Sequence, residues 1–216
     1  MTYAGENGLI TMKRDVVCLE GLFYWINGGI AMSSISKQRL STRELTMTAL
    51  FVTLITAGAF IRVPLPNCPF TLQILFTTLA GIILGRRLGA ISVGIYIILG
   101  LIGVPVFTSG GGPGYVFQPT FGYLIGFMVG AYVMGRFSEL SPTHSVKTLL
   151  MGAIINLLIV YGFGMVYLYM IMNVYLGTPI GWWAVIWSCF LIPVGPDIFL
   201  CVVAAVMGKR IIGQLR

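Results

Sequence analysis

Long apolar segments dominate this sequence and restrict what it can fold into. The chain has 216 residues, is 57% hydrophobic and is only 9% charged. A helix needs about 20 apolar residues to cross the hydrocarbon layer of a bilayer. We therefore predict an all-α integral membrane protein with six transmembrane helices in residues 41–216. Residues 1–40 are more mixed, and we expect them to form a cytoplasmic extension of unknown use.

The predicted helices are bounded by polar residues, prolines and glycines. The first begins at Ser41, which stands three residues before Glu44, the spacing of a capping box. The segment VPLPNCPF that follows is too rich in proline for a regular helix. The six predicted spans are 41–61, 71–84, 90–106, 117–134, 148–172 and 182–207, the last interrupted by Pro193, Gly195 and Pro196.

The basic residues are distributed asymmetrically between the predicted loops. If the N-terminus is cytoplasmic, only Arg62 among the basic residues flanking the spans lies outside, which is a strong positive-inside pattern. We therefore predict a cell-membrane protein in contact with lipid, with both termini cytoplasmic. The net charge of +7 then reflects topology and not a nucleic-acid surface. The predicted inner residues are Lys37, Arg39, Arg43, Arg86, Arg87, Arg136, Lys147, Lys209, Arg210 and Arg216.

The stretch TSGGGPGYVFQPTFGYLIGFMVG, residues 108–130, joins two apolar runs through three consecutive glycines and a Pro-Gly pair. Backbone that is not helical can lie within a bilayer only where protein buries it or where it lines a cavity. We therefore expect this loop to form part of a binding site.

Asp197 is the only acidic residue within the membrane-spanning region, because the other five, Glu44 among them, flank that region on the predicted cytoplasmic side. An ionisable group inside a membrane is costly and usually faces the bundle interior. Pro196 suits the first turn of a helix, so Asp197 is predicted at a helix start, where it binds a ligand or accepts backbone N–H groups. Gln73 offers a ligand both a donor and an acceptor, unless it joins two helices. Tyr115, Tyr123 and Tyr161 are candidates for aromatic pocket walls, although interfacial belts use many tyrosines.

Small residues recur at spacings of four in three predicted helices, which allows close helix approach. Internal packing is the first expectation for each set. A docking face for another membrane protein is the alternative, and it is best placed on the unbroken first helix. The three sets are Ala49, Thr53 and Ala57; Gly81, Gly85 and Gly89; and Gly122, Gly126 and Gly130.

Several kinds of chemistry lack their motifs. The four cysteines form no CxxC pair and His144 is the only histidine, so we predict no metal site. No GxxxxGK[ST], HExxH or GxSxG motif occurs, so we predict neither a catalytic site nor ATP hydrolysis by this chain.

The sequence resembles the BioY family, the biotin-binding S components of energy-coupling factor (ECF) transporters. The resemblance rests on VPLPNCPFTLQ, LGRRLGAISVGIYIILGLIGVPVF and SGGGPGYVFQPTFGYLIGF, and it covers residues 45–208. Tyr161 and Gly164 resemble the YxxG of the family's fifth helix, and VGPDIFL resembles its PGD segment, with the substrate-contacting acid at Asp197.

This resemblance implies a six-helix bundle with an outward-facing pocket that captures biotin. It also implies docking, through Ala49, Thr53 and Ala57, on a transmembrane coupling protein and two ATPase subunits that use ATP. Asp197 and Gln73 are then expected to meet the ureido group. Backbone N–H groups of the glycine loop, at Gly111 and Gly112, are expected near the ligand, because glycine permits close approach.

The sequence departs from the family where members often carry a lysine, three residues after the acid, since Leu200 stands there. Arg62 is the substitute that we expect to meet the valerate carboxylate. The departure leaves open a different small vitamin or biotin precursor as ligand. A weaker alternative is a membrane enzyme that uses Asp197 as a general base.

Overall fold

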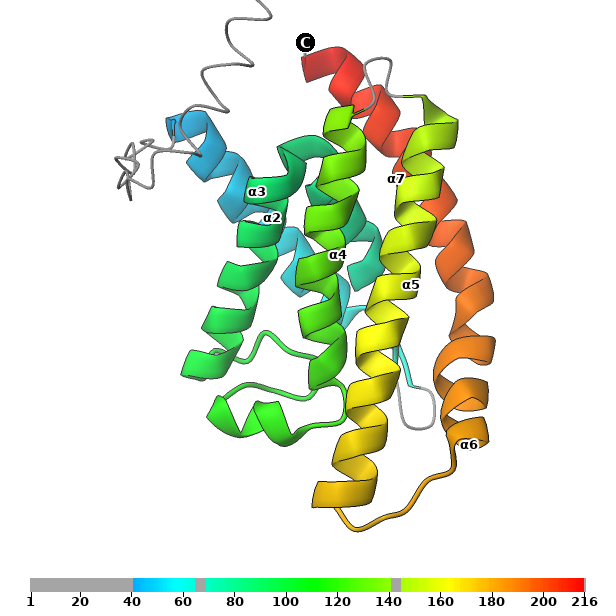
Figure 1. The fold of residues 1–216 in the computed structure, drawn as a ribbon. Coiled ribbons are helices and arrows are strands. Elements are labelled where there is room, and N and C mark those ends of the chain that lie inside the picture. The colour runs from blue at the N-terminus through cyan, green and yellow to red at the C-terminus, as the bar shows by residue number, and fades with distance from the viewer. Residues whose placement is uncertain (1–40, 65–68, 141–144, 216) are drawn as a thin grey trace, which may run out of the picture. The chain divides into compact units, whose positions relative to one another are not determined.

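The computed structural model describes residues 41–64, 69–140 and 145–215. The predicted extension 1–40, His144, Cys18 and Cys68 lie outside the described residues. The helices are α2 (Thr42–Phe60), α3 (Gln73–Ile102), α4 (Phe121–Leu140), α5 (Val146–Met170), α6 (Trp182–Ile186) and α7 (Ile192–Leu215) (Figure 1). Shorter elements are β1 (Arg62–Val63), β2 (Phe70–Thr71), the 3-10 helix η1 (Pro113–Phe117) and two π-helical turns, η2 (Ile171–Tyr175) and η3 (Trp187–Leu191).

Four helical segments of the described chain are long and apolar enough to cross a membrane, so the protein is a multi-pass membrane protein. They are Thr42–Phe60, Gln73–Ile102, Val146–Tyr175 and Trp182–Gln214. Helix α3 packs against α2, α4 and α7, while α5 packs against α4 and α7.

Helix α2 begins as the sequence predicts. The Ser41 hydroxyl accepts the backbone N–H of Glu44 at 3.2 Å, and the Glu44 carboxylate accepts the N–H of Ser41 at 2.8 Å. The reciprocal pair satisfies two backbone donors that a helix start leaves without partners. The capping box is therefore confirmed.

The predicted second and third spans are joined in α3, which turns sharply at Gly85. This residue has φ of 79°, a conformation that favours glycine. After the turn, a Cβ on Gly89 would lie 3.0 Å from the carbonyl oxygen of Ala80, and Gln73 contacts Tyr96. The two halves of α3 therefore lie side by side and antiparallel, as Figure 1 shows.

The glycine ladders pack the bundle, which confirms the first expectation for two of the three sets. A Cβ on Gly81 would lie 2.7 Å from the carbonyl oxygen of Ala131 in α4. A Cβ on Gly126 would lie 2.8 Å from the Cα of Val160 in α5. Helix backbones approach this closely only where a side chain is missing.

The predicted helix start at Asp197 is wrong. The helical run continues from α6 through η3 into α7, and Asp197 lies in the second turn of α7 with Pro196 inside the helix. Pro196 has no N–H to donate to the carbonyl four residues earlier, which weakens the helix without ending it here. The π-helical turn η3 ends at Leu191, two residues before the first of the two prolines, Pro193.

Candidate functional site

Two adjoining cavities lie where the start of α3 meets α4, α5 and α7. They have volumes of about 40 and 50 Å³, and Thr71, Tyr123 and Phe127 line both. The first, called here the Asp197 cavity, is also lined by Ile74, Leu157, Val160, Tyr161, Pro193 and Asp197. The second, called here the Gln73 cavity, is also lined by Pro69, Gln73, Tyr96, Thr108, Tyr115, Thr120 and Leu124.

Asp197 is 8% exposed and forms part of the wall of the first cavity. The hydroxyl of Tyr161, on α5, donates a hydrogen bond to its Oδ2 atom. A carboxylate offers about four lone-pair positions, so one tyrosine leaves capacity for further donors. The predicted residues Asp197 and Tyr161 are thus brought together, and the pair can accept N–H groups from a ligand.

Gln73 is the first residue of α3 and is 3% exposed. Its Nε2 atom donates to the hydroxyl of Tyr96 at 2.9 Å, and Tyr96 donates to the carbonyl of Val106 at 3.2 Å. Both Gln73 and Tyr96 line the second cavity. The amide therefore joins the two halves of α3 and also lines the cavity. Its contact with a ligand stays a prediction.

Tyr115 lies in η1 and is 6% exposed. Its hydroxyl lies 3.0 Å from the Thr108 hydroxyl and 3.2 Å from the Thr120 hydroxyl. Its ring packs against Phe107, with ring centres 4.3 Å apart. The loop thus supplies the Gln73 cavity with an aromatic surface edged by three hydroxyl groups.

The glycines of the loop are used to fold the loop itself. Gly110 and Gly112 have φ of 110° and 116°. The Gly112 N–H donates to the carbonyl of Gly100 at 2.7 Å, and a Cβ on Gly111 would lie 2.3 Å from the carbonyl oxygen of Val104. Neither Gly111 nor Gly112 is among the lining residues of the two cavities. Their contact with a ligand stays a prediction.

Arg62 lies in β1, and its guanidinium donates to the carbonyl of Thr108. It is exposed and does not line either cavity, although Thr108 lines the Gln73 cavity. Leu200 is 8% exposed and belongs to the apolar core. The position three residues after the acid, where the resemblance led us to expect a lysine, therefore offers no charge here.

The small residues of α2 lie on its outer side. Ala49, Thr53 and Ala57 are exposed, whereas Phe51 and Ile55 face the bundle. Because the three positions are four residues apart, they form one stripe along the helix. The stripe is accessible in this chain, as a docking face requires.

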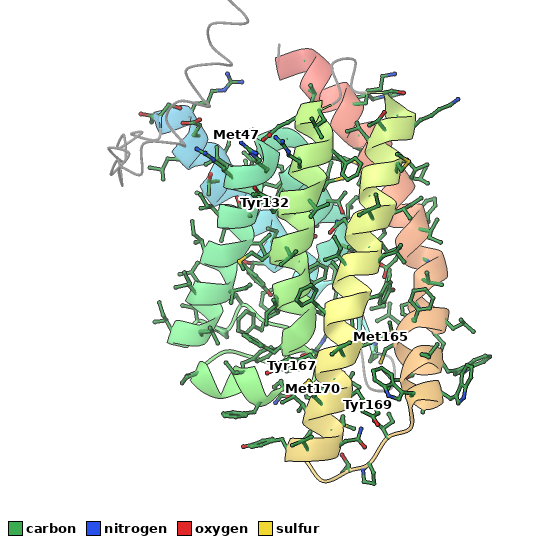
Figure 2. All side chains as sticks on the ribbon, viewed as in Figure 1. Met47, Tyr132, Met165, Tyr167, Tyr169 and Met170 are labelled. Atoms are coloured by element: carbon green, nitrogen blue, oxygen red, sulfur yellow. The ribbon has the colours of Figure 1, made fainter. Side chains whose placement is uncertain are left out.

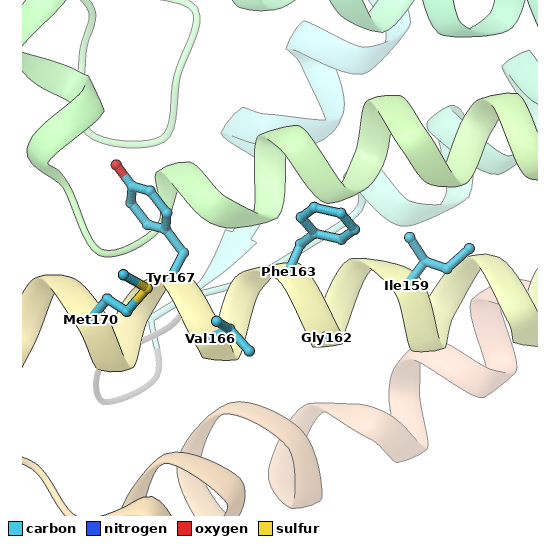
Figure 3. A pocket seen from close by; sticks show the side chains of 6 residues that line it. All are labelled: Ile159, Gly162, Phe163, Val166, Tyr167 and Met170. Carbon is cyan, nitrogen blue, oxygen red and sulfur yellow. The ribbon is translucent and has the colours of Figure 1, made fainter.

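A larger hollow on α5 is an open apolar groove of about 440 Å³. Ile159, Gly162, Phe163, Val166, Tyr167 and Met170 line it (Figure 3). Its one hydroxyl, on Tyr167, already donates to the carbonyl of Val116. Tyr167, Tyr169 and Met170 follow one another toward the end of α5 that leads to η2 (Figure 2). A small-molecule site needs polar groups that fix orientation, so the two inner cavities are the better candidates.

Sequence reasoning missed Tyr96, Thr71, Thr108 and Thr120. Each is a common residue type in an apolar or loop segment, and no spacing marks it. Gln73, at the start of the second predicted span, could have indicated that a polar partner such as Tyr96 lies nearby, because a buried amide needs hydrogen-bond partners. Its partner became identifiable only once the two halves of α3 were known to lie together.

The sequence model of the BioY family matches residues 32–216. A probable biotin transporter BioY of Lysinibacillus sphaericus is 44% identical over 171 residues, which cover 79% of this chain and 87% of the relative. The biotin transporter BioY of Thermotoga maritima is 33% identical over 171 residues, which cover 78% of this chain and 95% of the relative.

A solved structure shares the fold. The crystal structure of the S-component for biotin from an ECF-type ABC transporter superposes with a TM-score of 0.69 at 28% identity, covering 80% of this chain and 92% of that one. The sequence match, the relatives and the shared fold agree with the motifs identified in the sequence. The chain belongs to the BioY family.

Proposed function

We infer that this protein is the substrate-binding S component of a biotin uptake system. It captures biotin and delivers it inward together with an ECF module, and it is not an enzyme. The observation that carries the inference is the buried pair of Asp197 and Tyr161, which lines a cavity beside the Gln73 cavity. The named relatives are biotin transporters, and the similar structure is an S component for biotin.

The two cavities offer groups that suit the parts of biotin. The ureido ring has N–H donors for Asp197 and a carbonyl acceptor for donors such as the Gln73 amide. The thiophane ring suits the aromatic walls that Tyr115, Tyr123 and Tyr161 provide. Arg62 is proposed for the valerate carboxylate at the edge of the Gln73 cavity. Gly111 and Gly112 are proposed to approach the ligand from the loop.

Binding requires the two cavities to merge. Each holds only a few water molecules, whereas small-molecule pockets have volumes of roughly 300 Å³ or more. The side chains between the cavities are those of Thr71, Tyr123 and Phe127. We therefore propose that these three side chains move apart when the ligand enters.

The proposed topology has six helical passes and a pocket that opens to the outside. The 12 residues from Gln73 to Leu84 rise about 18 Å, short of the roughly 30 Å of the hydrocarbon core. The first half of α3 therefore leaves room between its start at Gln73 and the outer surface, where we place the pocket. The described basic residues at the Gly85 turn, Arg86 and Arg87, are then cytoplasmic, as are both chain termini in the cell membrane.

The proposed partners are a transmembrane coupling protein and two ATPase subunits, which use the ATP. The exposed stripe of Ala49, Thr53 and Ala57 supports docking through α2, because small side chains allow a partner helix to approach closely. Surrounding lipid is the other partner of the bundle.

The proposal is tested by purifying the protein in detergent and identifying co-purified small molecules by mass spectrometry. Calorimetric titration with biotin then gives the affinity. We expect biotin to be found or to bind tightly. Folded protein that neither carries nor binds biotin would contradict the proposal.

A different small vitamin or biotin precursor is the second candidate ligand. The buried, uncharged Leu200 favours it, because a charge near the acid is missing. Competition of labelled biotin with desthiobiotin and other vitamins separates the two candidates. Displacement by another compound at lower concentration than by biotin would favour the second candidate.

A further inference from the structure

Asn156 is a polar residue of α5 that is completely buried. It is 0% exposed, and it comes directly before Leu157, which lines the Asp197 cavity. Its Nδ2 atom donates to the hydroxyl of Thr78 in α3 at 2.8 Å, and Thr78 is also 0% exposed. The Thr78 hydroxyl donates in turn to the carbonyl of Ile74 at 2.6 Å, and Ile74 lines the same cavity. These two hydrogen bonds therefore connect the α5 wall of the cavity to its α3 wall.

The directions of these hydrogen bonds fix the orientation of the Asn156 amide. A hydroxyl has one proton, and Thr78 gives it to the Ile74 carbonyl, so Thr78 accepts from the amide nitrogen. Oδ1 points away from that nitrogen and has no hydrogen-bond partner among the described residues. A Cβ on Gly130 in α4 would lie 1.8 Å from Oδ1, so the oxygen fills the space of a missing side chain. The contact that this leaves is a weak Cα–H···O interaction.

Asn156 thus lies at a junction of three helices. Both α3 and α5 pack extensively against α4, whereas their direct contact with each other is small. Apolar packing is not directional, so it does not by itself fix how far one helix is shifted or rotated against another. A buried polar pair does, because its two atoms must stay about 3 Å apart. A single buried asparagine fixes the register of coiled-coil helices in this way.

The shape of the Asp197 cavity depends on how α5 is placed against α3. The cavity takes Ile74 from α3, and it takes Leu157, Val160 and Tyr161 from α5. Tyr161 lies farther along the same helix as Asn156 and donates to Asp197. A shift or rotation of α5 would therefore move several wall residues at once, including the tyrosine that contacts the acid.

We propose that Asn156 is a positioning residue for ligand binding, which holds α5 against α3 through Thr78 and thereby sets the shape of the Asp197 cavity. It lines neither cavity, so it acts through Tyr161 and the other wall residues. The inference rests on the proposed function for its ligand. In a merely structural role, the same hydrogen bond would stabilise the bundle and leave the ligand affinity unchanged.

The first experiment removes one hydroxyl group. Thr78→Val keeps the shape of the side chain and takes the acceptor from Asn156, whereas Thr78→Ser keeps the hydroxyl. Calorimetric titration should give a Kd for biotin about fivefold higher in Thr78→Val, equivalent to about 1 kcal/mol, and close to wild type in Thr78→Ser. Thr77→Val is the matched control, because Thr77 is equally buried but donates only to carbonyls of its own helix, at Gln73 and Ile74. Its biotin affinity should not change.

A double-mutant cycle tests whether Asn156 is the partner through which Thr78 acts. Asn156→Ala alone should raise the Kd for biotin at least as much as Thr78→Val. The double variant should have the Kd of Asn156→Ala, since both substitutions remove the same hydrogen bond. A Kd that rises by the product of the two single effects would overturn the proposed relay.

Gly130→Ala tests the position of the amide oxygen without any ligand. The added Cβ overlaps Oδ1 in the wild-type background. In the Asn156→Ala background the nearest remaining contact is the Cγ2 atom of Val160 at 3.4 Å. Gly130→Ala should therefore lower the unfolding temperature clearly in the first background and much less in the second. Equal decreases would overturn the junction.

The outcomes separate this inference from the proposed function. Unchanged biotin affinity in Thr78→Val, even with a lower unfolding temperature, would overturn the positioning role. An equal loss of affinity in Thr77→Val would also overturn it. If wild-type protein binds no biotin, the proposed function is wrong, and the comparison of Gly130→Ala in the two backgrounds then supports or overturns the junction at Asn156 by itself.

Discussion

Replacing Asp197 with asparagine removes one negative charge from the cavity wall and leaves the size of the side chain almost unchanged. The side chain is 8% exposed, and Tyr161 donates a hydrogen bond to it. An asparagine can still accept that hydrogen bond through its amide oxygen. The substitution therefore preserves the contact between α5 and α7 and changes mainly what the cavity offers to a ligand.

The expected loss of affinity follows from the strength of the hydrogen bond to the ligand. A hydrogen bond to a charged group contributes about 1.5–3 kcal/mol and a neutral one about 0.5–1.5 kcal/mol. If a neutral bond remains, the loss is about 1 kcal/mol, which raises Kd about 5-fold. If the asparagine NH2 group faces a ligand N–H, the whole contribution is lost and Kd rises up to about 150-fold.

Calorimetric titration with biotin measures this affinity, and thermal unfolding of the ligand-free protein supplies the second observation. Because a charge inside a membrane protein is costly, we expect Asp197→Asn to unfold at the same temperature as wild type or higher. Glu139→Gln is the matched control, since it makes the same change at Glu139, which pairs with Arg86 at 3.3 Å far along the chain from both cavities. Its biotin affinity should not change.

Two results would refute the reasoning. An unchanged biotin affinity in Asp197→Asn would show that the carboxylate does not contact the ligand. A lower unfolding temperature with unchanged affinity would show that Asp197 serves the structure of the bundle instead.

Three further predictions concern docking, the loop and the second cavity. Ala49→Trp should abolish co-purification with the ATPase module and leave biotin affinity unchanged. The control Ile98→Trp, on the exposed surface of α3, should leave the complex intact. Loss of the complex in both variants would argue against a docking face on α2. Gly111→Ala should destabilise the protein by about 1–3 kcal/mol in thermal unfolding, because the added Cβ would overlap a carbonyl oxygen. At Gly114 an added Cβ meets nothing within 4 Å, so Gly114→Ala should change the stability by less than about 0.5 kcal/mol. Equal effects would contradict the packing argument. Tyr96→Phe removes the hydroxyl that Gln73 contacts and should weaken biotin binding about fivefold by calorimetry; unchanged affinity would exclude the Gln73 cavity as a ligand contact.

The features that the sequence predicted well depend on local physics. Ser41 and Glu44 form a capping box because both partners lie within one helical turn. The glycines spaced four apart around Gly126 predicted a close helix contact. A missing side chain leaves space for a neighbouring helix, and this holds for any helix that packs there. The predicted helix start at Asp197 failed because proline does not by itself decide where a helix begins. The preceding turn and the packing of α7 on α3 and α5 also contribute.

The sequence by itself determined that this chain is an all-helical membrane protein with one acidic residue, Asp197, within the membrane-spanning region. The reason is that the free energy of moving an apolar or charged side chain from water into the bilayer depends on the residue type alone. Only the tertiary structure decided that Tyr161 is the partner of Asp197 and Tyr96 the partner of Gln73. These pairs are 36 and 23 residues apart, and a hydrogen bond forms only between atoms about 3 Å apart. The turn at Gly85 brings Gln73 to Tyr96, and the packing of α5 against α7 brings Tyr161 to Asp197.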